Sequence, residues 1–500
     1  MKKISLSFLA VAGCILLAVF FVFNHIGARS YWCDEAAMAE AISVPFSQLY
    51  ERAIIDSHPI FYLYLAKIWS LVFGDGEIAL RSLSAIFFLL LVGFIYKVGS
   101  YIFKSKSAGL WAAFLAATNY FMIFWSMQAG RYAFSALIGL ASFYFLIKLT
   151  RKPEKLDYLF YILFSVIGAY SHPWLSLVFG SQILSILFFR KVTGNFWKII
   201  KSQLAVILLV LPNALIMISQ AKWGISSWIA RTDISALFES LKYMSRGNTI
   251  GYLAFSVLAI IFIFIYRKKQ KISAEEKFAA ASVIIYLISA PIFAFIVSLF
   301  KPIYVAGRYE MIIMPAFILL LAYLFSKIKN KYILFFIVPF IIIFSYNGVL
   351  ADKKEVDSYK SSEKSVAAGI LENLKDGDIV IATDLSWTTQ SFYLDKLNKE
   401  AKKDFKLIPF PEEMALHPGW RNAKQMLIDW PQYEKEADGL IKQIEETKNK
   451  DNQVWVLYSG ANLVSRLLYG KMAKNFNLVG GFQPLQPRES SWLDAVFVFN

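Results

Sequence analysis

The chain has 500 residues, of which 57% are apolar and only 18% are charged, and its mean hydropathy is +0.50. A soluble chain of this length needs more charge to cover its surface, so the composition excludes a soluble enzyme and indicates an integral membrane protein. The two cysteines, Cys14 and Cys33, are too few for a disulfide framework and lack the spacing of a metal site.

The first apolar segment, residues 4–24, follows two lysines and therefore resembles a secretory signal. Val11 to Cys14 also resembles a lipoprotein cleavage site. The apolar run nevertheless continues without a break to Phe23. We therefore expect an uncleaved first membrane span.

Similar apolar runs recur along the first 350 residues, and crossing a membrane takes about 17–25 residues. We expect eleven spans, near residues 4–24, 80–103, 108–125, 133–149, 156–170, 173–189, 199–220, 250–266, 278–300, 310–326 and 332–350. Every second loop between them is basic, and positive loops stay in the cytoplasm. The N-terminus is then cytoplasmic, and the net charge of +16 is a topology signal that argues against nucleic-acid binding.

The same topology exports residues 25–79, 126–132, 171–172, 221–249, 301–309 and everything after 350. These segments hold most residues with reactive side chains, namely Asp34, His58, Gln128, Arg131, His172, Lys222, Arg231, Arg308 and Tyr309. This segregation favours an extracytoplasmic active site in a multi-pass protein of the cell membrane.

The first outer loop carries an acidic pair, Asp34 and Glu35, just past the first span. A carboxylate at a membrane boundary is costly to keep ionised where water is excluded, so the pair is a candidate general base. A wet, acidic loop without chemistry explains the same residues. Further on, Pro59 starts an apolar and aromatic helix, Ile60 to Trp69, that is too short to span and is expected to lie in the membrane interface.

Six motifs in order resemble those of GT-C glycosyltransferases. The first three are Trp32-Cys33-Asp34-Glu35-Ala36, then His58-Pro59, then Gly74-Asp75 with Glu77, Ala79, Arg81, Ser84 and Ala85. The others are Trp125-Ser126 with Gln128, Ala129, Arg131 and Tyr132, followed by Tyr170-Ser171-His172 and by Gly307-Arg308-Tyr309. The similar branch contains protein O-mannosyltransferases, the lipid A aminoarabinose transferase and galacturonosyltransferases of lipopolysaccharide core. The resemblance covers residues 1–350 and implies a polytopic GT-C-type helical domain there.

The resemblance implies that Asp34 is the catalytic base. The implied reaction moves a sugar from a polyprenyl monophosphate carrier to an acceptor hydroxyl group of an envelope glycolipid, a glycan or a protein. Asp34 would accept the hydroxyl proton while the lipid phosphate leaves from the opposite face, which predicts inversion at the anomeric carbon. Glu35 belongs to the same catalytic motif, and orienting the loop or capping a helix is its alternative role.

A leaving phosphate needs cations, and arginine can hold its oxygens with two parallel hydrogen bonds. By resemblance we expect Arg308 and Arg131 to bind the donor phosphate, with Lys222 and Arg231 as further candidates. For the last two, an ordinary charged loop is an equal alternative. Arg308 also has the alternative role of an interfacial anchor.

The substrate-binding candidates are His58, Tyr309, Gln128 and His172. For His58 and His172, a local helix cap or a structural role is an open alternative. Relatives often have a second acidic residue in a motif that here reads Ser126-Met127-Gln128-Ala129-Gly130-Arg131, without a carboxylate. With so few ligands for a divalent cation, we expect metal-independent transfer without a cofactor.

Residues 351–500 are more charged and lack long apolar runs. We expect a helix over 361–374, strands over 378–382 and 454–458, and a helix over 461–476. Alternation of this kind is typical of a small α/β domain, here placed outside the membrane. It either recognises the acceptor or packs as a lid without chemistry.

Two other functions remain open. A secondary transporter would have charges near the bilayer midplane and paired halves, whereas here the ionisable residues lie in outer loops. A glycan polymerase or ligase would use a diphosphate-linked donor instead. The sequence leaves open the sugar, the acceptor, the carrier length and the oligomeric state.

Overall fold

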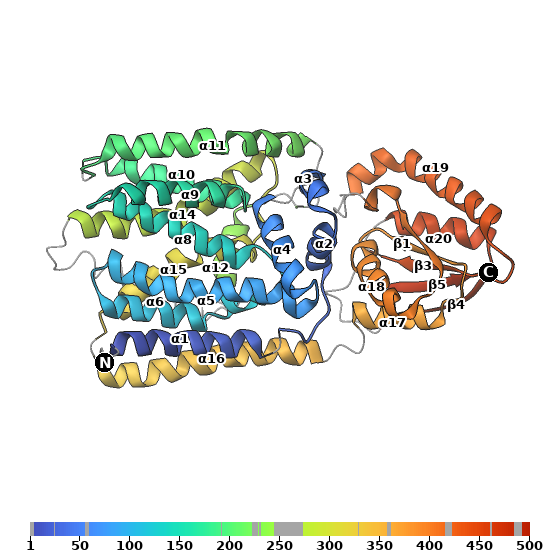
Figure 1. The fold of residues 1–500 in the computed structure, drawn as a ribbon, viewed down its shortest axis with the longest axis horizontal. Helices are drawn as coiled ribbons and strands as arrows, with labels where there is room; N and C mark the ends of the chain where they lie inside the picture. Colours follow the sequence, from blue (N-terminus) through green and yellow to red (C-terminus); the bar gives the residue numbers. More distant parts are fainter. Residues whose placement is uncertain are drawn as a thin grey trace.

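The structure is a computed structural model that describes residues 5–24, 26–55, 60–191, 193–222, 229, 232–244, 274–328, 330–357, 362–415, 423–460, 463–484 and 493–500. It consists of a helical bundle and, at one end of the bundle, an α/β domain (Figure 1). The N-terminus lies at the opposite end of the bundle from the α/β domain.

The bundle is built from apolar helices, most of which are long. They are α1 (Leu6–Phe23), α5 (Glu77–Ile102), α6 (Lys106–Thr118), α7 (Tyr120–Ser126), α8 (Tyr132–Leu149), α9 (Lys155–Ala169), α10 (Pro173–Phe188), α11 (Phe196–Lys222), α14 (Ala274–Phe300), α15 (Met314–Phe325) and α16 (Lys331–Asp357). Shorter helices are α12 (Ser235–Met244) and the 3-10 turn η1 (Tyr309–Ile312). Apart from 250–266, which lies outside the described residues, every expected span overlaps one of these helices or, for 108–125, the pair α6 and α7.

The chain is a multi-pass helical membrane protein. Among the described residues, five helices are long and apolar enough to cross a membrane, or six if the bent pair α6–α7 counts as one span. Several others, including α10 and α15, are apolar but shorter. Eleven full-length spans are therefore a prediction that the helices match in position but only partly in length.

The bent pair shows how the sequence shapes the bundle. α6 and α7 meet at an angle of 59°, with Asn119 between them. The Asn119 side chain accepts a hydrogen bond from Met122 N at 3.0 Å and so caps the second helix. After the break, α7 ends at Trp125 and Ser126, and the Trp125 indole contacts the backbone of Gly307.

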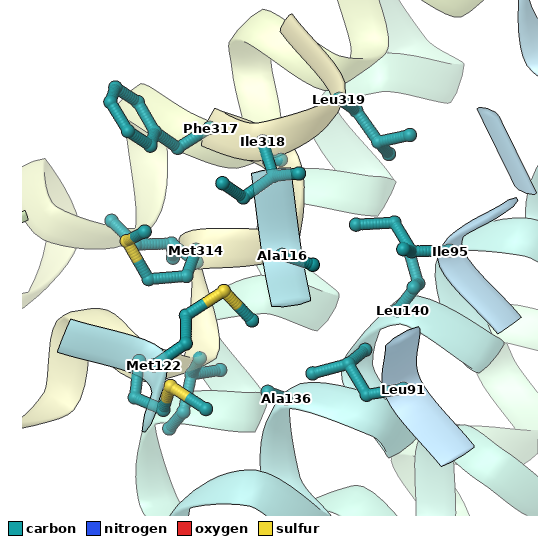
Figure 2. Packing of buried hydrophobic residues seen from close by; sticks show 14 of the residues in the cluster. Leu91, Ile95, Ala116, Met122, Ala136, Leu140, Met314, Phe317, Ile318 and Leu319 are labelled. Atoms are coloured by element: carbon teal, nitrogen blue, oxygen red, sulfur yellow. The ribbon is translucent and has the colours of Figure 1, made fainter. Parts of the chain in front are cut away.

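Small residues let the helices approach closely. Ala112, Ala113 and Ala116 of α6 are fully buried, and Ala116 lies among Leu91, Ile95 and Ile318 of neighbouring helices (Figure 2). A side chain on Gly109 would overlap Ser100 and the backbone of Tyr96 in α5. In a membrane, where helix association depends on packing, such contacts set the spacing of helices.

The first outer loop folds into three helices, α2 (Cys33–Ala41), α3 (Phe46–Ile55) and α4 (Ile60–Phe73). α4 packs on α3 and α5. It buries Tyr62, Leu63 and Ala66 but exposes a row of apolar side chains on its other face: Ile68, Leu71, Val72 and Phe73. A short helix that is apolar on both its buried and its exposed face fits the interfacial position expected from the sequence.

The C-terminal domain is a three-layer α/β fold. Its sheet has the order β2-β1-β3-β5-β4, with strands β1 (Asp378–Thr383), β2 (Phe405–Phe410), β3 (Val454–Tyr458), β4 (Leu478–Phe482) and β5 (Ala495–Phe499). β1 pairs in parallel with β2 and β3, and β5 pairs antiparallel with β3 and β4. The helices are α17 (Glu363–Asn373), α18 (Ser386–Ala401), α19 (Ala423–Thr447) and α20 (Leu463–Asn475), with the 3-10 turn η2 (Glu412–Ala415).

Alternate residues of the central strands enter two different cores. Ile379 and Ile381 of β1 pack with residues of α19 and α20. Val380 and Ala382 pack instead into a cluster that includes α17 and α18 and continues into the first outer loop. That cluster also contains buried side chains of α2 and α4, so one apolar core joins the α/β domain to the bundle.

The boundary between the two parts differs slightly from the sequence prediction. The prediction ends the membrane domain at residue 350, whereas α16 continues to Asp357. The extra helical residues, Ala351 to Asp357, are mostly charged, so the apolar run ends before the helix does.

Candidate functional site

Asp34 and Glu35 lie in the first turn of α2. Trp32 has an extended backbone and precedes the helix, and its N–H donates to Glu35 Oε2 at 3.4 Å. Carboxylates in a first helical turn are stabilised by the positive end of the helix dipole. The two side chains nevertheless differ in surroundings: that of Asp34 is 47% exposed and that of Glu35 only 1%.

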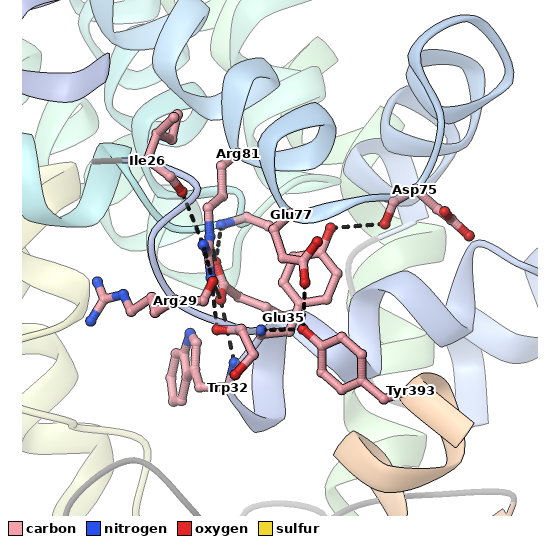
Figure 3. A network of polar contacts seen from close by, with 11 residues as sticks. Ile26, Arg29, Trp32, Glu35, Asp75, Glu77, Arg81 and Tyr393 are labelled. Atoms are coloured by element: carbon pink, nitrogen blue, oxygen red, sulfur yellow. Dashed lines mark hydrogen bonds and ion pairs between the residues drawn. The ribbon is translucent and has the colours of Figure 1, made fainter. Parts of the chain in front are cut away.

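Glu35 is held in a buried network (Figure 3). Arg81 of α5 donates to it from Nε at 2.8 Å and from Nη2 at 2.6 Å. Ala129 N donates to Glu35 Oε1 at 2.6 Å. The remaining guanidinium hydrogens point to backbone oxygens of Ile26, Arg29 and Ser30. Glu35 thereby ties α2 to α5 and to the loop between α7 and α8, which is the loop-orienting arrangement that the sequence left as an alternative.

Asp34 forms an ion pair with Arg308 Nη2. The Arg308 guanidinium lies 5.1 Å from the ring centre of Trp32 and 5.9 Å from those of Trp125 and Tyr132. Burial lowers the pKa of Arg308, and Tyr309 and Cys33 oppose that shift. An arginine between three aromatic faces and one carboxylate keeps a fixed orientation toward Asp34.

The turn that carries Arg308 is fixed on several sides. Gly307 has a φ of +80°, which glycine adopts without strain. Its carbonyl oxygen accepts from Trp125 Nε1 at 3.0 Å, and Arg308 N donates to Glu310 Oε2 at 2.8 Å. Glu310 is fully buried and accepts a second hydrogen bond from Ser240 of α12.

His172 lies beside the same cluster. It caps α10, and its Nδ1 accepts from Trp174 N at 3.1 Å. The imidazole ring is 5.0 Å from the Tyr309 ring and 6.3 Å from the Tyr132 ring. Burial, together with the charge of Arg131, holds the pKa of His172 well below 6.5. His172 is therefore neutral, and because Nδ1 accepts, Nε2 carries the proton.

The cluster contains more buried donors than acceptors. Within the described part of the chain, several buried nitrogen atoms of this region have no hydrogen-bond partner: Trp32 Nε1, Gln128 Nε2, Arg131 Nε, His172 Nε2, Trp174 Nε1 and Arg308 Nε. Buried donors are normally paired, so a surplus of donors with two arginines among them fits a ligand rich in anionic and hydroxyl oxygens.

The structure thus brings together Asp34, Arg308, Tyr309, His172 and the Gln128–Arg131 loop, as their shared outer placement in the sequence predicts. Three other candidates cannot be placed. His58 and Arg231 lie outside the described residues, and Lys222 is the last residue of α11, with its side chain outside the described part. Among the described residues, no group of three or more His, Cys, Asp or Glu is arranged to hold a metal ion. Metal independence remains a prediction.

Sequence reasoning gave no role to Arg81 or Glu310. Arg81 is one of only three charged residues in the long, mostly apolar helix α5, and such a residue in a membrane protein is a signal for a buried partner. Glu310 directly follows the Gly307-Arg308-Tyr309 motif, in which the sequence indicated roles only for Arg308 and Tyr309.

Comparisons with known proteins agree on the fold. The sequence profile of the dolichyl-phosphate-mannose-protein mannosyltransferase family matches residues 57–219. The crystal structure of ArnT from Cupriavidus metallidurans bound to undecaprenyl phosphate is similar over 98% of this chain and 97% of that one, with a TM-score of 0.63 and 12% identity. Its apo state gives a TM-score of 0.61 at the same identity and coverage. No curated protein matches the sequence significantly.

Proposed function

From the GT-C fold of this chain, shared with ArnT, we propose that the protein transfers a sugar from a polyprenyl monophosphate carrier to an acceptor hydroxyl group. The observation that carries the proposal is the pair of Asp34 and Arg308, enclosed by aromatic rings and by buried donors without acceptors. A carboxylate supplies a base, and a fixed arginine supplies a phosphate ligand.

The donor phosphate binds at Arg308. Arginine matches two phosphate oxygens with parallel hydrogen bonds, and Arg308 lies at the outer end of the bundle, where a membrane lipid can present its phosphate. The crystal structure of ArnT with undecaprenyl phosphate supports a lipid phosphate as the ligand of this fold. Arg131 Nε, the Nε2–H of His172 and Gln128 Nε2 add further buried donors without partners.

Binding of the phosphate also prepares Asp34. Arg308 pairs with Asp34, and a phosphate that takes over the guanidinium frees the carboxylate. Asp34 then accepts the proton of the acceptor hydroxyl as its oxygen bonds to the anomeric carbon. The bond from that carbon to the phosphate oxygen breaks, and the polyprenyl phosphate leaves with the electron pair. Attack opposite the leaving group inverts the anomeric carbon.

The other candidates have supporting roles. Glu35, with both oxygens engaged, positions α2 and is not a second base. Tyr309 shapes the pocket against His172, while Lys222, Arg231 and His58 remain candidates for binding phosphate or acceptor. The reaction takes place on the extracytoplasmic side without a metal, and the acceptor is an envelope glycolipid, a glycan or a protein.

The proposal is tested with purified protein in detergent and a panel of polyprenyl-monophosphate sugars, with cell-envelope extract as the source of acceptors. We expect the wild type to consume one donor and Asp34→Asn to spare it. The variant Lys67→Met, which removes an outer cation on α4 away from the cluster, is the control and should retain activity.

Two outcomes of this assay would favour a different function. Turnover of diphosphate-linked donors alone would favour a glycan ligase or polymerase. Consumption of no lipid-linked donor, together with uptake of a solute into vesicles, would favour a transporter.

A further inference from the structure

We propose that Tyr393, in the α/β domain, is a positioning residue for Asp34. Its hydroxyl group fixes the chain segment that leads into α2, so the reactive carboxylate is in place only while the α/β domain is docked. This inference rests on the proposed function in one respect, the role of Asp34 as the base.

The central contact joins residues that are far apart in the sequence (Figure 3). The Tyr393 hydroxyl oxygen accepts from Tyr31 N at 2.6 Å, and the same hydroxyl donates to Glu77 Oε1 at 2.9 Å. Tyr393 is fully buried. Burial, reinforced by the charge of Glu77, raises the pKa of Tyr393, so its hydroxyl keeps the proton that it donates to Glu77.

Further contacts hold Tyr31 in place, and together with the bonds of Tyr393 they are here called the clamp. Its hydroxyl group donates to Asp75 O at 2.9 Å, and its ring packs 5.4 Å from that of Phe392, the neighbour of Tyr393. Lys396, one turn further along α18, donates to Asp75 Oδ1 at 2.7 Å. α18 therefore contacts both the extended segment before α2 and the turn before α5.

The clamp connects directly to the reactive residues. The guanidinium of Arg81 lies 5.5 Å from the centre of the Tyr31 ring and holds Glu35. Cys33, next to Asp34, packs against Leu385, Met414 and Trp387 of the α/β domain. Only two residues separate the amide bound by Tyr393 from Asp34. A shift of this segment therefore moves the carboxylate relative to Arg308, and a misplacement of about 1 Å can lower a rate about 100-fold.

A matched pair of variants separates this role from general stabilisation. Tyr393→Phe removes only the hydroxyl group of the clamp. Tyr433→Phe removes an equivalent one: Tyr433 of α19 is also buried and donates to Glu413 Oε1 at 2.9 Å. Each variant loses a buried hydroxyl group and its bond to a carboxylate, and Tyr393→Phe also loses the bond from the Tyr31 amide, which is the contact under test.

Two measurements follow. Hydrogen exchange of the peptide over residues 31–41 should be about tenfold faster in Tyr393→Phe and unchanged in Tyr433→Phe, because only the first variant frees the Tyr31 amide. With the donor found in the activity assay, kcat should fall about 10- to 100-fold in Tyr393→Phe, with the KM for the donor unchanged. Tyr433→Phe should keep its kcat.

The proposal is overturned if exchange over 31–41 does not change in Tyr393→Phe, or if it rises while kcat remains at the wild-type value. Equal losses of kcat in both variants would also overturn it, since they would reflect stability alone. If the wild type consumes no donor, the proposed function fails, and the exchange result still decides whether Tyr393 holds the segment.

Discussion

Arg81 and Glu35 form a two-point ion pair, with Nε 2.8 Å from Oε1 and Nη2 2.6 Å from Oε2, and each side chain is only 1% exposed. Removing two charges from water is costly, and such a pair is tolerated only when further hydrogen bonds satisfy both groups. Here backbone oxygens and the Ala129 amide provide them. The pair therefore fixes the geometry of three segments around Asp34 at once.

Replacing one member of this pair should strongly destabilise the fold. Arg81→Met leaves the Glu35 carboxylate buried without its cation, and we expect a loss of about 3–5 kcal/mol. Adding Glu35→Gln to Arg81→Met should restore part of the lost stability, because the double variant no longer buries an unpaired charge. Thermal unfolding in detergent measures both. Lys104→Ala, which breaks a half-exposed pair with Glu275, is the control, with an expected cost below about 1 kcal/mol. Equal effects at the two pairs would contradict the prediction.

Arg308→Lys should weaken binding of a lipid phosphate although the charge is kept. Lysine cannot form two parallel hydrogen bonds and stacks less well between Trp32 and Trp125. Loss of a hydrogen bond to a charged group costs about 1.5–3 kcal/mol, which corresponds to about 10- to 100-fold in affinity. Titration with undecaprenyl phosphate measures the change, with Lys67→Met as the control for an outer cation. An unchanged affinity would remove Arg308 from the phosphate site.

The sequence predicts the bundle well because its signals are local. Apolar runs and basic loops locate the helices, and the outer placement of Asp34, Arg308 and His172 follows from the alternation of charge. What it does not predict is which of them touch. The pair of Asp34 and Arg308 depends on how α2 packs against the turn before η1, and no local pattern encodes that packing.

For the same reason, the sequence does not predict how the α/β domain docks on the bundle. Strands β1 and β3 are recognisable from their apolar runs, whereas neither the motif that follows Tyr31 nor the sequence around Tyr393 indicates the contact between the Tyr393 hydroxyl and the Tyr31 amide. Arg81 is an intermediate case, because its position inside an apolar helix is a signal for a buried partner but does not identify Glu35.

Gly307→Ala should disturb the turn that carries Arg308. The φ of +80° strains any residue with a side chain, and a Cβ there would lie 2.8 Å from the ring of Tyr243. Gly74→Ala is a matched control, since Gly74 has a φ of +83° and nothing within 4 Å of an added Cβ. Both variants should lose about 1–2 kcal/mol from the backbone. Only Gly307→Ala should also weaken binding of undecaprenyl phosphate, and equal binding by the two variants would contradict this.

His172→Asn should make the protein less sensitive to acid. The pKa of His172 in the folded state lies well below 6.5 because burial and Arg131 disfavour its charged form. As pH falls below 6.5, the unfolded chain gains a proton that the folded chain does not, so His172 lowers the wild-type stability progressively, by on the order of 1 kcal/mol at pH 5.5.

Asparagine is a good N-cap and can accept the hydrogen bond of Trp174 N in place of the imidazole, so α10 should stay intact. The variant and the wild type should then have similar unfolding temperatures at pH 7.5. At pH 5.5 the variant should unfold at the higher temperature, because all other histidines are common to both proteins and their contributions cancel. A wild type that loses no more stability than His172→Asn between these pH values would show that folding does not lower the pKa of His172. In that case His172 would be the neutral donor proposed for the site only above its ordinary pKa of about 6.5.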